Sequence, residues 1–299
     1  MRIAILSDIH ANLPALEAVL SDMRRVEPDL VVFNGDFINR GPSNRAVLER
    51  LWGFAAEHGK VWFTLGNHDD LVLKWARHDP SLSELYQDPL FAPAGWAATQ
   101  LEPAHLDWLD TLPFQVAVEE RGGVVGLERA EGLGQPAYLR ITHGSPRHYR
   151  EGYDDHQSLE VLGEIAQDYP AQVLVGSHTH RPFLYPLEGS LFLNSGAVGA
   201  PFNGDTRAQY LVLEIAGTQI QTEFRQVPYD LTSALRQFQT SGLLEECGLG
   251  AQIFQLETRL ARSLLTPFWI WANRQGLPRD EESWRLFQQA FPERFVGTG

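Results

Sequence analysis

Residues 1–10 read MRIAILSDIH, a short apolar run that ends in a cluster of polar side chains. The run from Arg2 to Leu6 is typical of a β-strand whose two faces are both covered. Asp8 and His10 follow it, two residues apart, and on an extended segment this spacing places both side chains on one side. The N-terminus is therefore predicted to be a buried strand that presents a carboxylate and an imidazole.

The chain continues as an alternation of helical and strand patterns. The expected elements are helices at 13–26 and 46–54 and strands at 30–33 and 61–65. Strands that alternate with helices indicate parallel βαβ units. Ligands of such sheets bind beyond the carboxyl ends of the strands, and polar clusters stand there at 7–10, 34–36 and 66–69.

The chain is predicted to divide into a domain over 1–230 and a helical extension over 231–299 that packs on it. Within the domain, residues 77–113 carry several prolines and tryptophans and are expected to form a helical insert near the site. Strands separated by Gly-rich turns are expected over 114–142, and a buried strand at 173–175. Antiparallel strands are expected at 191–193, 209–215 and 219–226, the last two joined by a turn at 216–218. After Pro228 no strand pattern recurs, which favours helices to the end of the chain.

Composition limits the classes of function. The formal net charge of −14 over 299 residues argues against a stable nucleic-acid complex or an anionic membrane surface, since both need clustered Lys and Arg. The single cysteine, Cys247, excludes an internal disulfide framework and fits a reducing compartment. The first apolar run is too short for a signal peptide, and no stretch is long enough to span a bilayer. A cytoplasmic protein is expected.

Five short polar segments carry the candidate chemistry. They are Asp8-Ile9-His10, Gly35-Asp36, Gly66-Asn67-His68-Asp69, Thr142-His143-Gly144 and Gly176-Ser177-His178-Thr179-His180. Each alone has an ordinary turn composition. Together they hold five of the ten histidines, each after an expected strand. Carboxylate oxygen and neutral imidazole nitrogen suit Zn, Mn, Fe and Ni, and a shared carboxylate can bridge two ions that clamp a phosphoryl group in an in-line displacement.

The order of these segments resembles the calcineurin-like metallophosphoesterase superfamily. The motifs span residues 8–180, and the turn at 194–199 with the strands that end near 227–230 extends the resemblance to about residue 230. The chain looks closest to the small bacterial and archaeal phosphodiesterases and phosphatases. The resemblance implies an α/β (α+β) fold, a four-layer β-sandwich flanked by helices, with the helical C-terminal extension added to it.

The resemblance also implies a dinuclear metal site. One ion would be held by Asp8, His10, Asp36 and His180, and the other by Asp36, Asn67, His143 and His178. His68 does not match a ligand but the residue that protonates or stabilises the leaving oxygen. The cofactors expected are two divalent metal ions, Mn first, with Fe, Zn, Ni, Co and Mg as alternatives, because the ligand set accepts several metals.

The segment Gly35–Pro42 resembles the Gly-Asp-x-x-Asp-Arg-Gly motif of Ser/Thr protein phosphatases and dinucleoside-polyphosphate hydrolases. Arg40 matches the arginine that grips phosphate, and a guanidinium suits bidentate phosphate binding. Asn39 stands where that motif has an aspartate paired with the catalytic histidine. Since a carboxylate would raise the pKa of the histidine, we expect His68 to be a weaker acid here, and good leaving groups to be handled best. Arg40, His68 and Asn67 are the expected substrate contacts.

Metal-dependent hydrolysis of phosphate esters, as a phosphodiesterase or a phosphomonoesterase, is the predicted function. Dinucleoside-polyphosphate hydrolysis and Ser/Thr protein phosphatase activity are the alternatives. A binding scaffold on the same fold is disfavoured, because all seven ligand positions and His68 are present. The expected partner is a small phosphorylated substrate or nucleotide, with a phosphoprotein as the alternative, and the sequence leaves the oligomeric state open.

Overall fold

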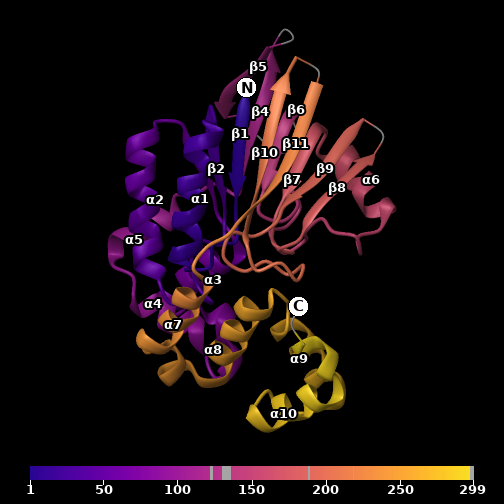
Figure 1. Cartoon of the computed structure of the whole chain (residues 1–299). Helices are drawn as coiled ribbons and strands as arrows, with labels where there is room; N and C mark the ends of the chain where they lie inside the picture. The colour runs from indigo at the N-terminus through magenta and orange to yellow at the C-terminus, as the bar shows by residue number, and fades with distance from the viewer. Residues whose placement is uncertain (122–123, 130–135, 188, 218, 297–299) are drawn as a thin grey trace.

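Two mixed β-sheets form the centre of the computed structural model, which describes residues 1–121, 124–129, 136–187, 189–217 and 219–296 (Figure 1). The first sheet has the strand order β11-β10-β1-β2-β3 and the second β5-β4-β6-β7-β9-β8. The strands are β1 Arg2–Leu6, β2 Leu30–Asn34, β3 Val61–Thr64, β4 Gln115–Arg121, β5 Val124–Arg129, β6 Ala137–Thr142, β7 Ala171–Gly176, β8 Pro182–Leu187, β9 Ser190–Ser195, β10 Ala208–Ala216 and β11 Gln219–Val227.

Helices cover the outer faces of both sheets. Those of the first 230 residues are α1 Leu13–Val26, α2 Asn44–His58, α3 Asn67–Ala76, α4 Ala92–Thr99, α5 Pro103–Asp110 and α6 Leu159–Asp168, with short 3-10 turns η1 Pro80–Leu82 and η2 Pro89–Phe91. The extension contributes α7 Leu231–Thr240, α8 Leu243–Leu260, α9 Leu265–Gln275, α10 Glu281–Ala290 and η3 Pro292–Phe295. The order helix, sheet, sheet, helix confirms the predicted four-layer α/β sandwich with a helical C-terminal extension.

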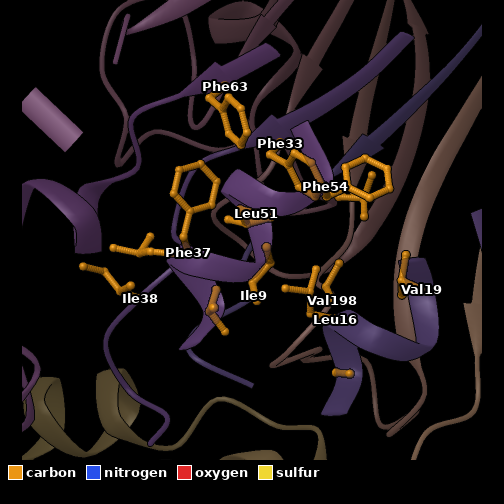
Figure 2. Close-up of a cluster of buried hydrophobic side chains, with 14 of the residues drawn as sticks. Ile9, Leu16, Val19, Phe33, Phe37, Ile38, Leu51, Phe54, Phe63 and Val198 are labelled. Carbon is orange, nitrogen blue, oxygen red and sulfur yellow. The ribbon is translucent and has the colours of Figure 1, made fainter. Parts of the chain in front are cut away.

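The side chains of β1 alternate between two buried cores, which explains why its sequence is apolar at every position after Arg2. Ile3 and Ile5 point into the core between the two sheets, whereas Ala4 and Leu6 point to the core beneath α1 and α2. Figure 2 shows the second of these cores, where Phe33 of β2 lies near Phe54 of α2 and Phe63 of β3. Full burial of such a side chain contributes about 1.5–3 kcal/mol. Packing on both faces thus holds the strands whose ends carry the polar clusters.

The predicted pairings of the first sheet are confirmed. β1 pairs parallel with β2 and β2 with β3, and β10 and β11 form the expected antiparallel pair. Three elements were not predicted: α3, whose first turn is the polar run 67–70, α6, and the edge strand β8, which is only partly buried. The second helix is longer than the predicted 46–54, since it ends only at Gly59, whose φ of 69° favours glycine.

The C-terminal helices pack against η2 and α4 and on one another. Leu90 of η2 contacts a cluster that includes Ile253, Phe268 and Phe287. In Figure 1 the yellow helices α9 and α10 lie beyond the lower ends of the strands, the ends at which β1 and β2 finish. Among the described helices, none is long and apolar enough to cross a membrane.

Candidate metal centre

Loops at the carboxyl ends of five strands converge to form the site. The residues come from the segments after β1 (Asp8, His10), β2 (Asp36), β3 (Asn67, His68), β6 (His143) and β7 (His178, His180). Neighbouring parallel strands end at the same edge, which brings Asp8, Asp36 and Asn67 together from the first sheet. The second sheet faces the first and contributes the remaining histidines. The structure therefore brings together all seven residues predicted as metal ligands.

The backbone of this region is unusual. Five of the seven predicted ligands adopt a positive φ between 49° and 63°: Asp8, His10, Asp36, His178 and His180. Non-glycine residues rarely adopt this left-handed conformation, and such residues cluster at functional sites where the surrounding structure holds them. The conformation of these loops therefore sets the direction of the ligand side chains, in addition to connecting the strands and helices.

The first cluster consists of Asp8, His10, Asp36 and His180, all buried. His180 Nε2 lies 3.2 Å from Asp8 Oδ1, and His10 Nε2 lies 3.7 Å from Asp36 Oδ2. The two imidazole Nε2 atoms are 3.2 Å apart. The four ligand atoms all lie within 4.8 Å of one another, a spacing that suits one central cation.

The second cluster consists of Asp36, His143 and His178. His143 Nε2 is 3.2 Å from Asp36 Oδ2 and also 3.2 Å from the Asn67 side-chain oxygen. Asn67 thus adds a fourth donor, an amide oxygen, to this cluster. Among the residues that the structure describes, Asp36 alone belongs to both clusters, so its carboxylate is in position to bridge two ions.

The donor atoms fit metal ions in their hydrogen bonding as well as in their position. Asp8 Oδ1 and Asp36 Oδ2 are buried and, beside their histidine neighbours, accept no hydrogen bond, whereas Asp36 Oδ1 accepts a hydrogen bond from the His68 backbone N–H at 2.7 Å. His143 Nδ1 donates to the Asn34 carbonyl at 2.8 Å, and His180 Nδ1 donates to the Ala200 carbonyl at 2.5 Å. Because Nδ1 of each ring is occupied by a carbonyl, Nε2 is the nitrogen that can bind a cation, in exchange for any proton it carries, as is usual for histidine ligands.

The charges of the clustered side chains also favour a bound cation. Burial would raise the pKa of Asp36, but the neighbouring His143 and His68 hold it well below its ordinary value. Burial would likewise lower the pKa of His143, yet Asp36 and Asp8 raise it to about 10. The buried carboxylates therefore stay ionised and attract positive charge, which a divalent cation supplies in a metalloprotein.

Asp69 supports the loop that carries Asp36, a role that the sequence did not reveal. Its carboxylate accepts hydrogen bonds from the backbone N–H groups of Asp36 at 2.7 Å, Phe37 at 2.9 Å and Gly66 at 3.1 Å. Burial and the adjacent Asp36 raise the pKa of Asp69 to about 7. A Cβ on Gly66 would lie 2.2 Å from the Asp36 nitrogen, so only glycine permits this approach. Asp69 stands three residues after Gly66, the N-cap of α3, and this spacing is the sequence pattern that could have indicated its role.

His68 lies beside the first cluster, with its ring 4.9 Å from that of His10. The Asn39 side-chain nitrogen is 2.9 Å from His68 Nδ1, while the Asn39 oxygen accepts the Arg40 backbone N–H at 2.7 Å. The second contact orients the amide, so Asn39 donates to Nδ1 and a neutral His68 carries its proton on Nε2. Burial lowers the pKa of His68 to about 3, against the pull of Asp36.

Arg40 is held by a partner from the C-terminal extension. Its guanidinium forms an ion pair with Glu257 of α8, whose side chain is 1% exposed, and lies 4.5 Å from the centre of the Phe254 ring and 5.2 Å from that of Phe202. The arginine still borders the cavity beside the metal centre. Its predicted contact with phosphate would therefore be made by a guanidinium whose position Glu257 sets.

A cavity of about 720 Å³ adjoins the two clusters. His68, His178 and His180 border it from the strand ends, and Trp271 and Arg274 of α9 border it from the extension. The C-terminal helices therefore form one wall of the cavity. A volume of this size suits a small molecule.

Comparison with known proteins agrees with this geometry. Residues 1–182 match the family model of the calcineurin-like phosphoesterases. An uncharacterised protein of Methanocaldococcus jannaschii is 26% identical over 267 residues, which cover 84% of this chain and 97% of that protein. The crystal structure of a metallophosphoesterase from Sphaerobacter thermophilus is 26% identical, with a TM-score of 0.60, and the match covers 85% of this chain and 100% of that one.

A hypothetical protein of Pyrococcus horikoshii, 19% identical with a TM-score of 0.64, shares the fold over 85% of this chain and 97% of its own. The segment that matches the family model contains all seven predicted ligands and His68. The family is metal-dependent, and the buried Asp and His clusters fit that property. The chain is therefore a hydrolase of phosphate esters and belongs to the calcineurin-like phosphoesterase family.

Proposed function

We propose that the chain hydrolyses phosphate esters at a dinuclear metal centre. Asp8, His10, Asp36 and His180 would hold one ion, and Asp36, Asn67, His143 and His178 the other. The observation that supports two ions is that both clusters include Asp36, whose Oδ2 atom is buried without a hydrogen-bond partner. Bound there, the two ions supply an activated water and neutralise charge on the reacting phosphate. Mn is proposed first among the metals that suit oxygen and imidazole donors.

His68 would act on the leaving group. Asn39 holds its Nδ1 as a hydrogen-bond acceptor, so the Nε2–H is the donor available to the leaving oxygen. A neutral imidazole stabilises negative charge on that oxygen mainly by a hydrogen bond, because it is a far weaker acid than an imidazolium. This arrangement supports the expectation that esters with good leaving groups react best.

The substrate class proposed is a small phosphorylated compound or nucleotide, either a monoester or a diester. The cavity beside the clusters is walled by the extension, which favours a small molecule over a folded phosphoprotein. A dinucleoside polyphosphate stays an alternative, because Arg40 borders the same cavity. A stable nucleic-acid complex or a membrane surface is not part of this proposal.

The test is a substrate panel on metal-stripped protein reloaded with Mn, Ni, Co, Zn or Mg. The panel contains an aryl phosphate monoester, an aryl phosphate diester and a dinucleoside polyphosphate, with product release followed for each. We expect hydrolysis of at least one ester and a dependence on added metal. If no metal restores hydrolysis of any of them, the scaffold interpretation replaces the enzyme.

Replacement of His68 by alanine separates the leaving-group role from metal binding. We expect kcat to fall by about 10²–10⁴-fold, the usual contribution of a positioned acid or base. Bound metal, measured by elemental analysis after gel filtration, should stay at the wild-type level because His68 belongs to neither ligand cluster. His58→Ala, at an exposed position at the end of α2, is the matched control. Loss of metal in the His68 variant would make it a ligand instead.

Replacement of Asn39 by aspartate should widen the range of leaving groups. A carboxylate at this position accepts a hydrogen bond from Nδ1–H, raises the pKa of His68 and allows it to act as an imidazolium acid. The measurement is kcat/KM for a series of aryl esters whose phenols differ in pKa. We expect the dependence on phenol pKa to become shallower, with the largest gain for the poorest leaving group. An unchanged slope would remove Asn39 from the explanation.

A further inference from the structure

The charged side chains that line the cavity are mostly cationic, although the chain carries a net charge of −14. Four arginines border the cavity: Arg40, Arg181, Arg274 and Arg294. Asp154 is the one carboxylate among the residues that line it. Arg274 belongs to α9 and Arg294 to η3, so two of the four cations come from the C-terminal extension.

Among the described residues, three of these arginines have no ionic partner. Arg40 is paired with Glu257. Over the described part of the chain, no carboxylate oxygen lies within 4.0 Å of a guanidinium nitrogen of Arg181, Arg274 or Arg294. Arg181 Nε donates to the Phe202 carbonyl at 3.2 Å, and Arg294 Nε is buried without a hydrogen-bond partner. Uncompensated guanidinium groups around a cavity concentrate an anion there.

The position of these arginines relative to the metal centre indicates what the anion belongs to. Arg181 follows the predicted ligand His180 directly in the chain, and the same cavity is bordered by His178 and His68. A molecule in this cavity can therefore contact both the metal centre and the arginines. Guanidinium groups match the several oxygens of a phosphate by paired hydrogen bonds, which favours phosphate over a single-point anion.

We propose that Arg181, Arg274 and Arg294 form a second anion subsite, which holds a phosphate group of the substrate other than the one being hydrolysed. The substrate class is then an organic bisphosphate on a small frame. This inference rests on the proposed function, because the reacting phosphate is placed at the metal centre. It assigns the extension a direct part in specificity: α9 and η3 supply binding groups that the first 230 residues lack.

The test is calorimetric binding of two phosphonates that cannot be hydrolysed, pentane-1,5-diyl bisphosphonate and pentylphosphonate, to the metal-loaded full chain. The bisphosphonate should bind about tenfold more tightly, since its second group adds charged hydrogen bonds. The ratio of the two affinities should fall in Arg274→Gln. In the double variant Arg274→Gln/Arg294→Gln it should fall to about threefold or less. Arg274 is exposed, so the single variant tests the subsite even if Arg294 proves necessary for folding.

Arg285→Gln is the control of equal charge, because Arg285 lies on α10, is 66% exposed and does not line the cavity. It should keep the wild-type ratio. Equal binding of the two phosphonates by the wild type, or an unchanged ratio in the double variant, would overturn the subsite. 6-Phosphonohexanoate carries a carboxylate in place of the second phosphonate. If it binds as tightly as the bisphosphonate, the subsite does not select phosphate. These binding measurements do not require hydrolysis, so they test the subsite even if the chain hydrolyses no ester.

Discussion

Replacement of Asp36 by asparagine is expected to reduce bound metal below one ion per chain and to lower kcat/KM by about a thousandfold, the effect of losing several kcal/mol of metal-dependent stabilisation. Asp36 is the only residue common to both clusters, and its Oδ2 lies 3.2 Å from His143 Nε2 and 3.7 Å from His10 Nε2. An amide keeps the size of the side chain but removes the charge that both ions would share. The measurements are metal content by elemental analysis and the rate with the best ester of the panel.

The matched control is Asp70→Asn, on the same segment of chain as His68. Asp70 accepts hydrogen bonds from Lys74 at 2.7 Å and from the Tyr149 hydroxyl at 2.5 Å and belongs to neither cluster. It should keep the wild-type metal content. Full occupancy by two ions in the Asp36 variant would contradict a bridging role and require each cluster to bind its ion independently.

The buried strands were predictable because both of their faces are covered. The run 2–6 is apolar at every position after Arg2, and the structure shows why: alternate side chains enter two different cores. The helix α3 was not predictable on the same principle, because its first turn is Asn67-His68-Asp69-Asp70, a composition that also suits a turn. β8 escaped prediction because it is an edge strand with only partly buried side chains.

The sequence predicted which side chains form the candidate site, but not the contacts that hold them in position. Five polar segments at strand ends predicted convergence, and the loops do converge. The tautomer of His68, in contrast, depends on the Asn39 amide being oriented by the Arg40 backbone N–H, a local contact with no sequence pattern. The partner of Arg40 lies 217 positions further along the chain, and only the packing of the extension brings Glu257 to it.

Replacement of Glu257 by alanine is expected to destabilise the protein by about 3–5 kcal/mol, the usual loss when one member of a buried ion pair is removed. Glu257 is 1% exposed and Arg40 11%, so water cannot replace the missing carboxylate well. The same carboxylate also accepts the backbone N–H groups of Leu264 at 2.6 Å and Leu265 at 2.8 Å, where α9 begins. The measurement is urea unfolding of the metal-free chain, with Glu245→Ala, exposed on the first turn of α8, as the control.

Two further variants separate the ion pair from the helix contacts. Glu257→Gln keeps an oxygen for the Leu264 and Leu265 N–H groups but removes the charge, so it should recover part of the lost stability. Arg40→Met in the Glu257→Ala background removes the unpaired cation and should be more stable than Glu257→Ala alone. A Glu257→Ala protein within about 0.5 kcal/mol of wild type, the range of ordinary surface substitutions, would contradict the pair. Confirmation would mean that the extension positions the arginine predicted to bind phosphate, and that its docking and the geometry of the site are coupled through one carboxylate.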